Sequence, residues 1–183
     1  MKDGGILVDD NQKVFKLCSI MLEYPHRDWM KFNILKQEVA QLENDKVQEM
    51  FLHFINYLQS TDVEQLCTNY VSTFDFNEGT TLYLTYTIFG DNRERGPAFV
   101  ELKKYFEEAG YFIETEELPD YLPLVLEFAA VAPAHITQKI FKVHRKGIEK
   151  LQNELEKFNS PYLPLINVCI KAINQYMKKT KAS

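Results

Sequence analysis

Apolar side chains recur at steps of three and four residues along most of this 183-residue chain, which is the spacing of one face of an α-helix. The pattern runs through 14–22, 29–42, 47–58, 63–74, 99–109, 140–158 and 165–176. Residues 121–131 are apolar nearly all round, as expected of a buried central helix. The sequence therefore predicts an all-α, single-domain bundle of about seven to nine helices.

One segment, Thr80 to Phe89, departs from this pattern, because its threonines, tyrosines and alternating leucines favour a strand. A lone strand would leave its backbone hydrogen bonds unpaired, and no second convincing strand is found in the sequence. We therefore expect a helix here, with Leu82, Tyr86 and Phe89 on one face.

Helix boundaries are indicated by short polar signals. Thr61 and Glu64 have the spacing of a capping box, Gly96-Pro97 is suited to a helix start, and Asp120 is placed to cap the helix that follows it. Gly110 suits the left-handed residue that ends a helix.

No repeat, low-complexity tract or proline-rich linker divides the chain, so residues 1–183 are expected to form one domain, with frayed ends at 1–10 and 178–183. The length is sufficient to bury a core without disulfides. Cys18, Cys67 and Cys169 lie far apart on apolar stripes, which favours reduced core cysteines. We expect a monomer or a weak dimer.

Charge is distributed unevenly. Residues 1–138 hold 11 Lys or Arg against 23 Asp or Glu, whereas residues 139–183 hold 10 against 3. An acidic surface repels nucleic acid and attracts basic partners, although it can also be a solvated surface without a partner. No apolar run has the roughly 18 to 20 residues of a membrane span, and Met1 to Asp10 lack a signal-peptide block, so a cytoplasmic location is expected.

Catalytic and metal-binding chemistry find no support in the sequence. The four histidines, His26, His53, His135 and His144, do not share a helix at one-turn spacing, and no glycine-rich phosphate loop is present. A general acid and a general base could come from Glu116, Glu117 and Asp120, but no nucleophile and no set of metal ligands accompanies these carboxylates. We therefore expect no enzyme activity, no metal and no cofactor.

Residues 70–130 are rich in aromatics and hold two polar clusters, at 91–96 and 116–120, which together indicate a recognition surface. The runs that carry most information are Tyr-Val-Ser-Thr-Phe-Asp-Phe (70 to 76), Thr-Leu-Tyr-Leu-Thr-Tyr (81 to 86), Gly90-Asp91 with Arg93 and Arg95-Gly96, and Glu-Leu-Pro-Asp-Tyr-Leu-Pro-Leu-Val-Leu-Glu-Phe (117 to 128). In order and spacing these runs resemble the NarJ family, the assembly chaperones or delta subunits of respiratory nitrate reductase, within the wider group that includes TorD and DmsD. Leu17 to Pro25 is similar to the family's first helix. Many relatives have His where this chain has Tyr121, and a phenol does not titrate near neutral pH.

The resemblance implies an all-helical chaperone that binds the N-terminal region of the apo catalytic alpha subunit of nitrate reductase. It would keep that subunit competent for molybdenum cofactor insertion and membrane attachment. The alternative is a generic helical adaptor for an unrelated client protein.

The candidate client-binding surface lies in the region that carries the resemblance. A lone acid in an apolar helix, Glu127 requires a compensating partner if it is buried, and Arg93 or Arg95 is the obvious candidate. Alternatively, Glu127 lines a cleft and meets a basic residue of the client. Asp91, Arg93 and Arg95 either fix a tight connection between two helices or border the client groove, and both alternatives stay open. The residues predicted to contact the client are Tyr83, Tyr86, Asp91, Arg93, Arg95, Asp120, Leu122, Leu126 and Glu127.

Overall fold

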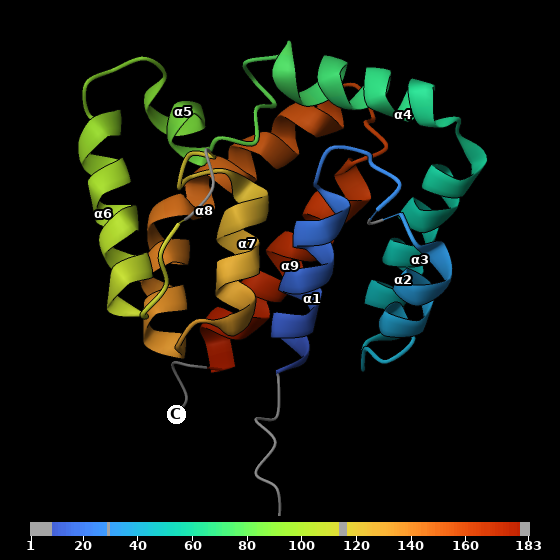
Figure 1. Ribbon diagram of the computed structural model, residues 1–183, viewed down its shortest axis with the longest axis horizontal. Coiled ribbons are helices and arrows are strands. Elements are labelled where there is room, and N and C mark those ends of the chain that lie inside the picture. Colours follow the sequence, from blue (N-terminus) through green and yellow to red (C-terminus); the bar gives the residue numbers. More distant parts are fainter. Residues whose placement is uncertain (1–8, 29, 114–116, 180–183) are drawn as a thin grey trace, which may run out of the picture.

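The computed structural model describes residues 9–28, 30–113 and 117–179, and these form an all-α fold without a β-strand (Figure 1). The fold class predicted from the sequence is confirmed. The helices are α1 (Asp10–Met21), α2 (Phe32–Val39), α3 (Asp45–Ser60), α4 (Val63–Tyr70), the π-helical turn η1 (Val71–Asp75), α5 (Leu84–Phe89), α6 (Arg95–Glu108), α7 (Leu122–Val131), α8 (Ala134–Lys157) and α9 (Leu163–Lys179).

The helices form two main layers. Helices α8 and α9 pack together at the back of the view in Figure 1, and α1 and α7 pack side by side in front of them. Helices α2 and α3 lie on one flank, α5 and α6 lie on the other, and α4 crosses the upper end. This arrangement leaves the outer sides of α1 and α7 on one open face of the molecule.

A continuous core joins the layers. Phe15 on α1 contacts the rings of Phe141 on α8 and Tyr176 on α9, at centroid distances of 5.1 and 5.6 Å. Most of α7 is buried, as expected from its composition, and Leu122, Val125, Leu126 and Ala129 have no exposed surface. Cys18 and Cys169 lie in this core and Cys67 is half-buried, and all three are free thiols.

The segment from Thr80 to Phe89 is only partly helical, because α5 begins at Leu84. Tyr83 forms an isolated antiparallel bridge with Tyr121 instead. Leu122 N donates to Leu82 O at 2.9 Å, and Leu84 N donates to Asp120 O at 3.1 Å. The helix predicted for residues 80–83 is therefore wrong: their strand-like composition is satisfied by the short segment before α7.

The predicted start of α4 differs in the structure. Asp62, not Thr61, precedes α4, and the Thr61 hydroxyl donates to Tyr57 O at 2.8 Å at the end of α3. A capping box does occur at α1, where Asp9 and Gln12 exchange hydrogen bonds. Gly110, with a φ of 79°, follows α6 as predicted.

The predicted frayed ends are shorter than expected where they can be compared. Asp9 and Asp10 belong to the start of α1, and α9 continues to Lys179. Residues 1–8 and 180–183 lie outside the described residues.

His144 is a titratable side chain buried in the core. It is 1% exposed on α8, and neither ring nitrogen has a hydrogen-bond partner among the described residues. Burial lowers the pKa of its imidazole from 6.5 to about 4. Between pH 6.5 and pH 4, the imidazole of the unfolded chain is protonated whereas that of the folded protein is not. His144 therefore lowers the free energy of unfolding as the pH falls from about 6.5 to about 4.

Replacing His144 with Leu is expected to raise the free energy of unfolding at pH 7 by about 1 to 3 kcal/mol, because the unpaired nitrogens are removed. The substitution should also remove about 3 kcal/mol of the acid-induced decrease in the free energy of unfolding. Denaturant titrations at pH 7 and pH 4.5 measure both effects. His53→Leu is the control because His53 is exposed. Equal acid sensitivity in His144→Leu and the unmodified protein would contradict the prediction.

Candidate functional site

The nine predicted client-contact residues do not share one surface. Leu122 and Leu126 are fully buried in the core and offer no surface in this structure. Asp91 and Arg93 are exposed in the connection between α5 and α6. Tyr83 lies elsewhere, with its hydroxyl donating to Glu117 Oε2 at 2.9 Å and its ring 5.4 Å from that of Tyr121.

Arg95 belongs to an internal polar network. Its Nε donates to Thr85 Oγ1 at 3.0 Å, and its Nη2 lies 3.9 Å from Asp120 Oδ2. The guanidinium also lies over the rings of Tyr86 and Phe99, at 5.3 and 5.0 Å from their centroids. These contacts support the structural alternative for Arg95, that of fixing the connection between two helices.

Asp120 is fully buried and caps a different helix from the one predicted. Its Oδ2 accepts hydrogen bonds from Thr85 N at 2.9 Å and from Thr85 Oγ1 at 2.5 Å, and Thr85 is the second residue of α5. Helix α7, which follows Asp120, has no side-chain cap. The bridge between Tyr83 and Tyr121 is the reason, because it holds Asp120 against the start of α5.

Glu127 lies at the surface and not buried beside Arg93 or Arg95. It pairs with Lys16 of α1 at 2.5 Å, and both side chains are about half exposed. The predicted ion pair with Arg93 or Arg95 is therefore wrong. Glu127 occupies the outer side of α7, which faces α1 and the solvent, so its carboxylate needs no buried partner.

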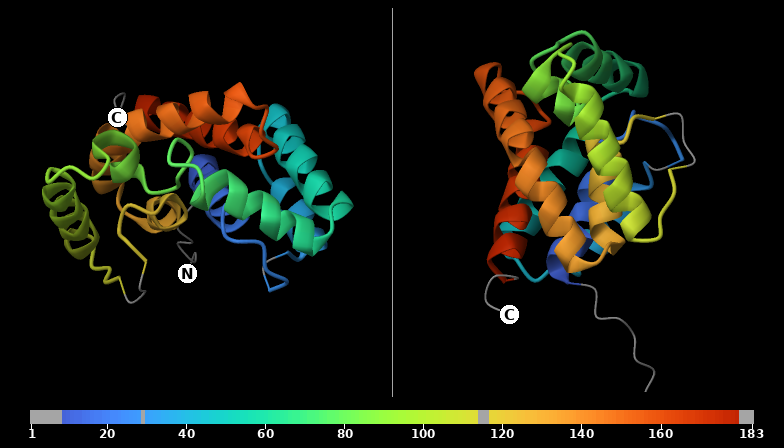
Figure 2. Two further views of the ribbon diagram at one scale, coloured as in Figure 1. Left: turned by 90° about the horizontal axis from the view of Figure 1, so that it is seen from above. Right: turned by 90° about the vertical axis from the view of Figure 1, so that its left-hand side faces the viewer.

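An apolar groove of about 870 Å³ runs along this outer side of α1 and α7. Ile20 of α1 and Leu124 and Phe128 of α7 contribute apolar side chains to it, and Phe106 closes it from α6. The connection after α1 and the connection between α6 and α7 project on the same side of the molecule (Figure 2). Of the groove's lining, Tyr111 and Phe112 belong to the second of these connections, whereas Ile34 and Glu38 belong to α2.

The rims of the groove carry large apolar side chains that water reaches. Ile34 is 53% exposed, Val131 is 56% exposed and Phe112 is 76% exposed, and Tyr111 lies beside Phe112. Exposed apolar side chains are ordinary when scattered, but their concentration around one hollow marks an interaction site. Of the predicted residues, Glu127 alone lines this groove. We call it the α1–α7 groove.

Charged groups are few in the α1–α7 groove. They are Lys13 and Lys16 of α1, Glu38 of α2 and Glu127 of α7. An apolar cleft with a small number of polar groups at its edge suits the apolar face of a helical segment. It has no arrangement of nucleophile and base.

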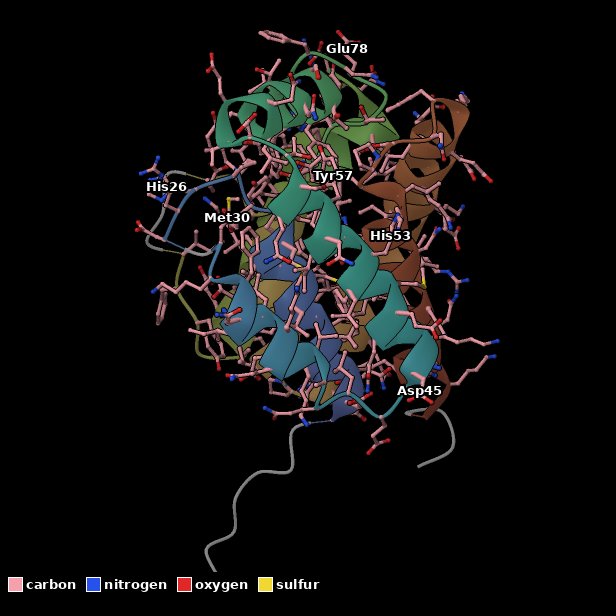
Figure 3. The ribbon with its side chains drawn as sticks, turned by 90° about the vertical axis from the view of Figure 1, so that its right-hand side faces the viewer. His26, Met30, Asp45, His53, Tyr57 and Glu78 are labelled. Carbon is pink, nitrogen blue, oxygen red and sulfur yellow. The ribbon has the colours of Figure 1, made fainter. Side chains whose placement is uncertain are left out.

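Metal-binding groups are dispersed in the described part of the chain, which contains no cluster of three His, Cys, Asp or Glu side chains. His26, on the projecting connection after α1, and His53, on α3, lie well apart (Figure 3). Within 9–28, 30–113 and 117–179 no helix has the length and apolar character needed to cross a bilayer. Glu116, one of the predicted acids, lies outside these residues.

The fold and the groove define an all-helical protein that presents a large apolar cleft. Comparison with known proteins gives the family: the sequence profile of the nitrate reductase delta subunit matches residues 40–167. The chain belongs to this family, and the resemblance found in its sequence runs is confirmed.

Several relatives are similar over most of the chain. The probable nitrate reductase molybdenum cofactor assembly chaperone NarJ of Bacillus subtilis (strain 168) is 36% identical over 165 residues, which cover 90% of each chain. The nitrate reductase molybdenum cofactor assembly chaperone NarJ of Escherichia coli (strain K12) is 27% identical over 173 residues, 91% of this chain and 72% of the relative. The probable chaperone NarW of the same strain is 29% identical over 121 residues, 66% of this chain and 51% of the relative.

Proposed function

We propose that this protein is a chaperone for the catalytic alpha subunit of respiratory nitrate reductase and has no catalytic role of its own. It binds the N-terminal region of the apo subunit and keeps that subunit competent for molybdenum cofactor insertion and membrane attachment. This work takes place in the cytoplasm. The observation that carries the proposal is the α1–α7 groove in a member of the delta subunit family.

Binding by this groove follows the helix-in-groove mode, in which an amphipathic segment lays its apolar face in a hydrophobic cleft. Ile34, Phe112 and Val131 lose their contact with water when the segment binds, at about 25 cal/mol for each Å² of apolar surface removed. Part of that gain offsets the cost of ordering the segment. A moderate affinity results, which suits a chaperone that must release its client.

The test is calorimetric titration with a synthetic peptide from the N-terminus of the catalytic subunit of the same organism. We expect a dissociation constant in the micromolar range or tighter, about −8 kcal/mol, that weakens as salt rises. A peptide of the same composition in scrambled order is the control. Absence of heat and of any fluorescence shift at low salt would rule out this mode of binding. Capture of only unrelated proteins by the intact chain would favour a generic adaptor.

A further inference from the structure

A second pocket, of about 190 Å³, lies beside the end of the α1–α7 groove where α1 ends and α7 begins. Two of its residues place it there, because Tyr24 follows α1 and Tyr121 immediately precedes α7. Its walls combine tyrosine rings with two carboxylates. The side chains that matter for its chemistry are Tyr24, Tyr70, Tyr83, Tyr121, Asp75 and Glu117.

The tyrosine wall is held in place by its own contacts. The Tyr70 hydroxyl donates to Leu22 O at 3.0 Å and lies 3.0 Å from the Tyr121 hydroxyl, and the Tyr121 ring packs on that of Tyr83. Tyr24 packs edge-on against Tyr70 at 5.4 Å. Fixed aromatic faces attract cations through the quadrupole of the ring.

The carboxylates of this pocket have no cationic partner within the described part of the chain. No ion pair joins Asp75, Glu117 or the neighbouring Glu23 to a Lys, Arg or His there. Loss of water and the charge of Glu117 raise the pKa of Asp75. Loss of water, then Glu127 and Glu117, raise the pKa of Glu23, while Lys16 lowers it. The acids therefore repel one another, and a cation would relieve that repulsion.

Glu23 also links the pocket to the groove, because it lies in the sequence between Ile20, which lines the groove, and Tyr24, which lines the pocket. A segment bound along α1 and α7 would therefore pass the pocket at one end. The groove's lysines, Lys13 and Lys16, come from α1 before its last turn, so the two ends differ in charge.

We infer that this aromatic and acidic pocket receives one arginine or lysine side chain of the client segment and so sets the register of that segment in the α1–α7 groove. The inference rests on the proposed function and adds the chemistry of one contact. Ring faces bind the flat guanidinium or the ammonium group, and Asp75 and Glu117 accept its hydrogen bonds. An anionic or purely apolar group would leave the carboxylates unpaired.

The test is a set of double-mutant cycles between the protein and the N-terminal peptide of the catalytic subunit. Glu117→Gln is the main protein variant and Asp75→Asn the second, since both residues are exposed at the pocket mouth and neither has an ion-pair partner to lose among the described residues. In the peptide, each Lys and Arg is replaced in turn by Gln. We expect Glu117→Gln to weaken binding of the unmodified peptide about tenfold and to leave the melting temperature unchanged.

At one peptide position the two losses should not add, because the side chain removed there is the one that Glu117 contacts. Glu156→Gln on α8, with the same charge change on an exposed side chain that does not line the pocket, is the matched control and should bind normally. Purely additive losses at every position would show general electrostatic attraction and overturn this inference, while the proposed function would stand. Failure of the unmodified peptide to bind the unmodified protein would overturn both.

Discussion

Replacing Phe112 with Ser is expected to weaken binding of the catalytic-subunit peptide by about thirtyfold or more, with little change in melting temperature. Phe112 is 76% exposed at the rim of the α1–α7 groove, so its ring contributes little to the fold and a large area to any bound segment. An aromatic anchor of this kind contributes about 2 kcal/mol or more to binding. Adding Ile34→Asn and Val131→Asn should bring the loss beyond about a hundredfold, since each removes a rim contact.

The chain offers matched controls for Phe112→Ser and Val131→Asn. Phe76 is 85% exposed in the loop after η1 and does not line the groove, so Phe76→Ser should bind the peptide normally. Val100 of α6 is 54% exposed, close to the 56% of Val131, and also lies outside the groove, so Val100→Asn controls for Val131→Asn. Calorimetry and thermal unfolding on every variant separate binding from stability. Loss of binding in Phe76→Ser with normal binding in Phe112→Ser would move the site to the 70–76 run.

Most of the fold could be predicted from the sequence, because a helix that buries one face has apolar residues at every third or fourth position. Apolar residues at this spacing predicted the helices α1, α3, α8 and α9. The apolar composition of α7 predicted its central position. Residues 80–83 were predicted wrongly because strand pairing depends on a partner. Here the partner is the short stretch 120–122, where Asp120 and the flanking Pro119 and Pro123 give no strand signal.

The candidate site was harder to predict because a groove is made by elements distant in sequence. Ile34, Phe112 and Val131 belong to α2, a loop and the end of α7, and no local pattern joins them. Phe112 gave one usable signal, since it follows the helix-ending Gly110 and so had no helical stripe to join. The polar side chains of Arg95 and Asp120 suggested client contact because they lie in an aromatic region of the sequence. In the structure they belong to an internal hydrogen-bonded network. Client contact by the nine residues predicted from the sequence remains a prediction.

Asp120→Ala is expected to reduce the free energy of unfolding by about 3 to 5 kcal/mol, because removal of this fully buried side chain leaves its hydrogen-bonding and ion-pair partners unsatisfied. The change removes the acceptor for Thr85 N at the start of α5 and leaves the Arg95 guanidinium without its carboxylate. For a chain of this length the melting temperature should fall by roughly 10 °C. Asp120→Asn should cost less, since its amide oxygen still accepts from Thr85 N.

The arginines of the α5–α6 region provide the control for this network. Arg95→Ala should lower stability, because Arg95 bonds Thr85 and approaches Asp120, whereas Arg93→Ala should not, because Arg93 is exposed and has no ion pair with another described residue. Thermal unfolding of the four variants, Asp120→Ala, Asp120→Asn, Arg95→Ala and Arg93→Ala, gives the comparison, with peptide titration beside it. The network lies just before the start of α7, whereas the groove is lined by α7 residues between Leu124 and Val131. Its loss should therefore weaken client binding only as far as it unfolds the protein. Normal stability with lost peptide binding in Asp120→Ala or Arg95→Ala would instead make these residues client contacts, as the sequence first predicted.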